Sequence, residues 1–94
     1  MLDITEKAQD MLNQYISQGE DANLAVRIEI VGRGAKGFNY DLQLVPIEDA
    51  KDGDVETESN GLKLLIAERS VQYINGTTLD YKETLMGGGF AFDN

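Results

Sequence analysis

The stretch Gly32-Arg33-Gly34-Ala35-Lys36-Gly37-Phe38 joins two runs in which apolar and polar residues alternate. Residues 24–31 before it and residues 38–44 after it place Leu, Val, Ile, Phe or Tyr at every second position. This period of two on both sides of a glycine-rich turn predicts a β-hairpin. The turn also spells G-x-G-x-x-G, but a dinucleotide site needs a helix after those glycines, so that phosphates meet its N-terminus. The following strand therefore excludes the nucleotide interpretation.

An amphipathic helix is predicted before this hairpin. Thr5 is a favourable N-cap, and Gly19 ends the helical pattern. Apolar residues repeat between these two positions at the spacing of one helix face. They are Ala8, Met11, Leu12, Tyr15 and Ile16.

Further strands are predicted after the hairpin. Residues 55–58 and 62–66 flank Asn60-Gly61, a dipeptide typical of a type I′ turn. A short helix is expected over residues 67–74. Strands are expected over residues 78–81 and 90–92, with Gly87-Gly88-Gly89 separating them.

This order predicts an α+β fold: a single domain over residues 1–94, with a mixed or antiparallel β-sheet in two layers and the N-terminal helix on one face. The expected inward-facing residues are apolar and follow the periodicities above. They are Leu12, Ile16, Val26, Ile28, Ile30, Tyr40, Leu42, Leu64, Ile66, Val71 and Ile74.

The composition narrows the classes of partner. The formal net charge is −9, and only 8 residues are Lys or Arg, which disfavours nucleic acid and anionic membranes as partners. No apolar run reaches the length of a membrane-spanning helix or a signal segment. The chain has no cysteine and so no disulfide framework. We therefore expect a cytoplasmic protein that binds neither nucleic acid nor a membrane.

The absence of both Cys and His constrains the chemistry further. Sites for zinc, copper and iron–sulfur clusters rely on thiolate and imidazole ligands, and many enzymes use the same groups as nucleophile or base. The sequence therefore predicts no catalytic residue, no metal ligand and no enzyme activity. Carboxylates gather only in residues 48–58, where a solvated acidic connection is the simpler interpretation and a Ca²⁺ or Mg²⁺ site the alternative.

Taken in order, these motifs resemble the A-type iron–sulfur carrier family, also called HesB-like or iron–sulfur biogenesis domains. The resemblance covers essentially the whole chain. The turn at 32–38 is similar to the family's G-G-C-S-G-F, and residues 87–94 are similar to its G-S-G-F-x-F-x-N. The resemblance implies the HesB-like fold, with iron–sulfur assembly or recipient proteins as partners, and it allows a homodimer.

The family's metal ligands do not carry over. Its members hold iron or a cluster through three cysteines, one in the turn and two in a C-G-C motif past the terminal Asn. This chain has Ala35 in the turn, and the given sequence stops at Asn94. An alanine methyl group cannot donate electrons to iron. We therefore expect no cofactor, although the family would imply iron or an iron–sulfur cluster.

Three functions fit these observations. The first is a cysteine-free protein-interaction module in cluster biogenesis or delivery, which we favour because function depends on sites and not on folds. The second is a truncated or altered A-type carrier that bound iron through cysteines now absent. The third is an oxygen-ligand divalent-cation protein that uses the acidic segment.

A partner-binding surface is predicted where the turn and the C-terminal segment converge in the family. There the sequence offers cations beside aromatic side chains, a combination enriched at interfaces. The candidate residues are Arg33, Ala35, Lys36, Phe90 and Phe92.

Overall fold

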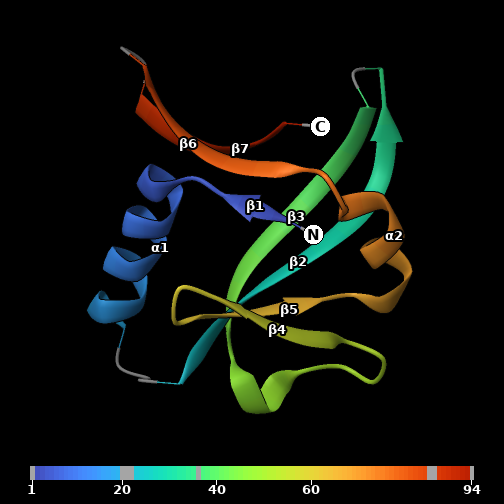
Figure 1. The fold of residues 1–94 in the computed structure, drawn as a ribbon, viewed down its shortest axis with the longest axis horizontal. Coiled ribbons are helices and arrows are strands. Elements are labelled where there is room, and N and C mark those ends of the chain that lie inside the picture. The colour runs from blue at the N-terminus through green and yellow to red at the C-terminus, as the bar shows by residue number, and fades with distance from the viewer. Residues whose placement is uncertain (1, 20–22, 36, 85–86, 94) are drawn as a thin grey trace.

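A computed structural model describes residues 2–19, 23–35, 37–84 and 87–93 of the chain. Within these residues it forms two β-sheets, helix α1 (Glu6–Gln18) and a short helix α2 (Val71–Ile74) (Figure 1). Two 3₁₀ turns, η1 (Ile47–Asp49) and η2 (Glu68–Ser70), complete the elements. The predicted α+β class is confirmed.

The larger sheet is built on the predicted hairpin. Its strands are β2 (Leu24–Gly34), β3 (Gly37–Pro46), β4 (Val55–Ser59) and β5 (Leu62–Ile66), in the order β3-β2-β5-β4. The β2–β3 and β4–β5 pairs are antiparallel, and β2 and β5 are parallel, so the sheet is mixed. Asn60 and Gly61 both have positive φ, at 51° and 84°, which the predicted type I′ turn requires.

The smaller sheet joins the two ends of the chain. It contains β1 (Asp3–Ile4), β6 (Thr78–Thr84) and β7 (Gly87–Asp93), with β6 in the centre. The three glycines expected to separate two strands lie inside β7, so that prediction was wrong. Gly88 explains why, because a Cβ placed there would lie only 2.3 Å from the Tyr81 hydroxyl oxygen. The bare backbone lets β7 pass close to that ring.

Helix α1 is fixed at its start by Thr5, as predicted. The Thr5 hydroxyl oxygen accepts the backbone N–H of Ala8 at 3.2 Å, and the hydroxyl donates to Asp80 Oδ1 at 2.8 Å. The cap therefore also ties the helix to β6. This hydroxyl, with the backbone N–H of Tyr81, holds the pKa of the Asp80 carboxyl below its usual range.

The hydrophobic core lies between the larger sheet, α1 and the smaller sheet (Figure 1). Most of the predicted inward residues belong to it: Leu12, Val26, Ile28, Leu64, Ile66 and Ile74 are buried, and Ile16, Tyr40 and Leu42 are half-buried against them. Ile30 is also half-buried. The core also takes in apolar residues absent from the prediction, namely Leu2, Ala8, Leu62 and Leu79.

Val71 was predicted in the core and is 37% exposed, so that prediction was wrong. The expected helix over residues 67–74 divides into the turn η2 and the four-residue α2. Ser70 takes the buried position instead, and its hydroxyl oxygen accepts the backbone N–H of Ile30 at 3.0 Å. This hydrogen bond fixes α2 beside β2.

Candidate functional site

The predicted partner-binding residues divide between two parts of the fold. Arg33 is the penultimate residue of β2, and Ala35 is exposed at the tip of the β2–β3 hairpin. Phe90 and Phe92 lie in β7. Lys36 lies outside the described residues.

A β-bulge decides where Arg33 lies. Ile30 pairs with Tyr40, but Gly32 pairs with Asn39, so β2 carries one extra residue, Val31, against β3. The extra residue reverses the alternation beyond it. Arg33 therefore pairs directly with Phe38 and lies on the same sheet face as Phe38 and Tyr40. Without the bulge, alternation from Ile30 would place Arg33 on the opposite face.

The Arg33 side chain lies over an aromatic pair. Its guanidinium carbon is 5.1 Å from the centre of the Phe38 ring, within the range of a cation–π contact. The Phe38 ring in turn lies 5.2 Å from the ring of Tyr73, in α2. Tyr73 is 45% exposed, so this aromatic pair remains open to solvent on one side.

A second guanidinium approaches from η2. Arg69 donates a hydrogen bond to Glu29 Oε2, and its side chain is 73% exposed. Glu29 also accepts a hydrogen bond from Arg27 at 2.8 Å through its other oxygen. These two partners, Arg27 foremost, hold the pKa of the Glu29 carboxyl below its usual range. Glu29 therefore remains paired without Arg69.

These side chains line a hollow of about 520 Å³ between the tip half of the hairpin and the segment of η2 and α2. We call it the arginine hollow, and among its lining residues we use Arg33, Phe38, Arg69, Gln72 and Tyr73. Of the residues described as lining it, none carries a carboxylate. The hollow thus combines two guanidiniums, a carboxamide and two aromatic rings.

Phe90 and Phe92 contact tyrosines on other elements. The rings of Phe92 and Tyr40 are stacked, with centroids 4.2 Å apart. Phe90 lies 5.0 Å from Tyr81 and 6.2 Å from Tyr15, both in edge-to-face geometry. Both phenylalanines are half-buried against the core.

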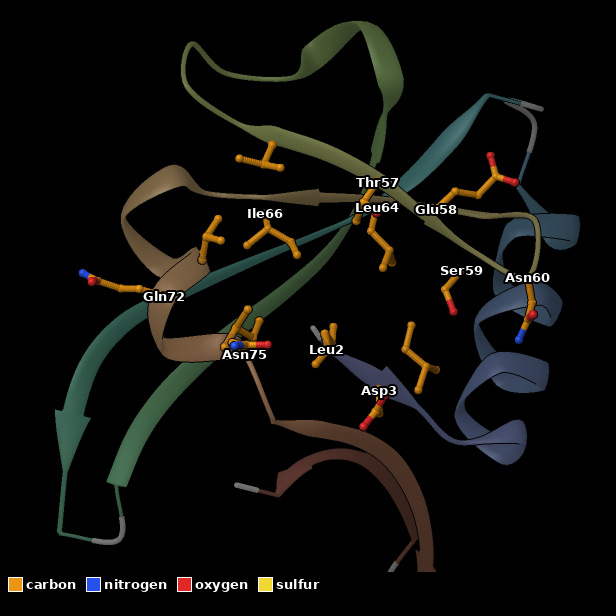
Figure 2. A pocket seen from close by; sticks show the side chains of 14 residues that line it. Leu2, Asp3, Thr57, Glu58, Ser59, Asn60, Leu64, Ile66, Gln72 and Asn75 are labelled. Carbon is orange, nitrogen blue, oxygen red and sulfur yellow. The ribbon is translucent and has the colours of Figure 1, made fainter.

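A larger, apolar groove lies on the core side of the β4–β5 hairpin, with a volume of about 570 Å³. Figure 2 shows Leu2, Leu64 and Ile66 gathered between β1 and that hairpin, with Gln72 on α2 at one end and Asn60 at the other. Asp3 and Glu58 are its acidic residues. Val55 of β4, one of its lining residues, is 42% exposed.

The acidic segment 48–58 is organised by an ion pair. Asp54 accepts two hydrogen bonds from Arg27, at 2.9 and 3.0 Å, and its side chain is only 3% exposed. Arg27 is the main reason that the pKa of the Asp54 carboxyl lies below its usual range. In residues 2–19, 23–35, 37–84 and 87–93, no group of three or more Asp, Glu, His or Cys is arranged to hold a metal ion.

Sequence reasoning missed Phe38, Arg69 and Tyr73 as neighbours of Arg33. The first could have been found, because a hairpin register places Phe38 opposite Arg33 once the bulge is recognised. Arg69 and Tyr73 are distant in sequence, and no local pattern places η2 and α2 beside the hairpin. Across the part of the chain that the structure describes, no helix is long and apolar enough to cross a membrane.

Comparison with known proteins gives a family model named for iron–sulphur cluster biosynthesis, which matches residues 1–94. The chain is 36% identical to the iron–sulfur cluster insertion protein ErpA of Idiomarina loihiensis, covering 99% of this chain and 78% of that protein. It is 38% identical to ErpA of Haemophilus influenzae, covering 99% and 80%.

Solved structures give the same result. The chain is similar to IscA with a 2Fe–2S cluster, at a TM-score of 0.75 and 31% identity, covering 100% of this chain and 82% of that one. It is also similar to Escherichia coli SufA, at a TM-score of 0.80 and 25% identity, covering 99% and 79%. These matches confirm the predicted HesB-like fold.

The comparisons correct the expectation of no cofactor. The relatives are named for iron–sulfur cluster insertion, and one was solved with a cluster, so the cluster belongs to the chemistry of this group of proteins. The side chains of this chain cannot by themselves ligate an iron–sulfur cluster. Its 94 residues include neither Cys nor His, and the turn offers the methyl group of Ala35. Thiolates for a cluster would therefore come from outside these residues.

Proposed function

The chain belongs to the iron–sulphur cluster biosynthesis family, and on this premise we propose that it is a non-catalytic protein-interaction module in cluster biogenesis or delivery. The proposed module is the single domain of residues 1–94, acting in the cytoplasm. Its partners are iron–sulfur assembly or recipient proteins. The cluster is their cargo, and the partner supplies the thiolates that hold it.

One observation supports this proposal: a family fold is combined with a chain that has neither Cys nor His. By the family resemblance, Ala35 occupies the turn position of a family cysteine, and the hairpin beside it is paired from Leu24–Pro46 to Gly34–Gly37. Arg33 is fixed over Phe38 at this end of the hairpin. Since function depends on the site and not on the fold, we assign this end of the hairpin to contact with another protein.

The proposed contact surface comprises the predicted residues Arg33, Ala35, Lys36, Phe90 and Phe92. The hairpin and β7 are connected by the Tyr40–Phe92 stack, which supports treating them as one region. Arginine and aromatic side chains are enriched at the cores of interfaces. Because both phenylalanines are half-buried, we assign direct contact mainly to the hairpin and a supporting role to β7.

The test is a binding titration between this chain and purified iron–sulfur assembly and recipient proteins, including a cysteine-bearing member of the same family. We expect Arg33→Glu/Lys36→Glu to weaken binding by about tenfold or more, since reversing interface charges costs well over 1.4 kcal/mol. Lys63→Glu/Lys82→Glu makes the same change in net charge on exposed residues of β5 and β6. If both double variants bind the partner with equal affinity, the hairpin is not part of the interface.

A further inference from the structure

We propose that the arginine hollow is a binding site for an acidic peptide segment in which an aromatic residue is flanked by carboxylates. This inference deepens the proposed function and rests on it, since it gives the chemistry of the segment that the partner presents. It is carried by the placement of Arg33 and Arg69 in one hollow with the Phe38–Tyr73 pair.

The distribution of charge is the first argument. The chain contains three arginines in a protein of net charge −9, and one of them, Arg27, is buried against Asp54 and Glu29. The other two, Arg33 and Arg69, both line this hollow. An acidic segment is repelled by the net negative charge of the chain and attracted by the two guanidiniums that this hollow brings together.

The state of the two guanidiniums is the second argument. Arg33 is held over the Phe38 ring, so its planar group is oriented before any ligand arrives. Arg69 is mostly exposed, and its present partner, Glu29, also accepts a hydrogen bond from Arg27. A guanidinium has five donors, so the exposed Arg69 can bind an added carboxylate while it keeps its hydrogen bond to Glu29.

The Phe38–Tyr73 pair is the third argument. Phe38 and Tyr73 contact each other with ring planes tilted by 52°, and Tyr73 is open to solvent. A ring from the partner can pack against Tyr73 while carboxylates on either side reach the arginines. A volume of about 520 Å³ accommodates a few side chains and not a folded element.

Arginines beside aromatic rings also occur in sites for single-stranded nucleic acid. The observations favour a peptide, because a nucleic-acid site follows the phosphate backbone along a basic groove. Here the overall charge is −9 and the described lining holds only two cations. A second copy of this chain is also disfavoured, since two such acidic surfaces repel each other.

The test is fluorescence anisotropy with a labelled ten-residue peptide that has two Glu on each side of one Phe, and with its matched peptide in which Gln replaces every Glu. We expect the Glu peptide to bind at least about tenfold more tightly. Arg33→Gln and Arg69→Gln should each weaken its binding by about fivefold or more, and Arg69→Lys by nearly as much, because lysine lacks the planar fork. Lys63→Gln, equal in charge but distant from the hollow, should leave binding unchanged.

Equal binding of the two peptides, or an equal loss with Lys63→Gln, would overturn the proposal. Tighter binding of a ten-nucleotide single strand than of the Glu peptide would overturn it as well. Circular dichroism of each variant reports folding, and Arg69, being exposed, is not expected to change it. If the chain binds the peptide but no iron–sulfur protein, the peptide site in the arginine hollow is supported and the proposed function is refuted. The reverse result would refute the hollow alone.

Discussion

The rings of Tyr40 and Phe92 are stacked, with centroids 4.2 Å apart and planes only 10° from parallel. Tyr40 lies in β3 of the larger sheet, and Phe92 lies near the end of β7 in the smaller sheet. This contact connects the C-terminal strand to the hairpin that carries Arg33. The fold around the candidate site therefore depends on a pair of aromatic residues 52 positions apart (92 − 40).

Replacing Phe92 with Ala should lower the free energy of unfolding by about 2 kcal/mol, less than the 3–5 kcal/mol of a fully buried Phe because this ring is half-buried. Phe92→Leu should recover about half of that loss and leave a deficit of about 1 kcal/mol, the usual value of an aromatic pair beyond its burial. Urea unfolding of the three proteins measures both. A loss below about 0.5 kcal/mol for the Ala variant, the range of surface changes, would show that the stack does not hold β7.

The phase of strand β2 gives a second prediction. Ile28 is fully buried, and its truncation to Ala should cost about 2–5 kcal/mol through lost burial and a residual cavity. Val31, the bulged residue in the same strand, is 58% exposed, so Val31→Ala should change stability by less than about 0.5 kcal/mol. Thermal or urea unfolding compares the two. Similar costs at both positions would contradict the strand's orientation.

The Arg27–Asp54 ion pair predicts how stability depends on pH. The folded pKa of Asp54 lies below its unfolded value, so the pair stabilises the protein fully above about pH 4, and this contribution is lost as the pH falls through the folded pKa. Asp54→Asn should therefore cost about 3 kcal/mol at pH 7, where Arg27 loses a buried partner. The difference from wild type should shrink toward zero in acid.

The free energy of unfolding, measured at about five pH values between pH 2 and pH 7, tests this dependence, because carboxylates titrate in this range. Asp52→Asn is the matched control, because Asp52 lies in the same segment with an exposed side chain. A pH-independent loss for Asp54→Asn would mean that the variant acts through packing and not through the charge of Asp54.

Much of the fold follows from local signals in the sequence. The alternation around residues 32–38 gave the hairpin, Thr5 gave the start of α1, and Asn60-Gly61 gave the tight turn, because each depends on neighbouring residues alone. The burial of Leu65 depends on distant ones. It shares a sheet face with Arg27, which Asp54 of the β3–β4 connection contacts, so β5 is buried on both faces. No alternation within β5 could predict that.

The candidate site was predictable in part. The sequence identified Arg33 and the hairpin that carries it. The extra residue Val31 moves the Arg33 side chain to the other face of the sheet, and a β-bulge cannot be recognised from a single sequence. Phe90 and Phe92 were grouped with the cations by family resemblance, whereas in the structure their ring contacts are to tyrosines. Arg69 and Tyr73 join Arg33 only through tertiary packing.

The central claim is that this chain acts in iron–sulfur cluster biogenesis through a protein-binding surface at its glycine-rich hairpin. The most direct measurement is affinity purification of the tagged chain from cells that make it, with quantitative mass spectrometry against the Arg33→Glu/Lys36→Glu variant. We expect iron–sulfur assembly or recipient proteins to be enriched with the wild type and to decrease by about tenfold with the variant. Recovery of no such protein, or equal recovery with both, would contradict it.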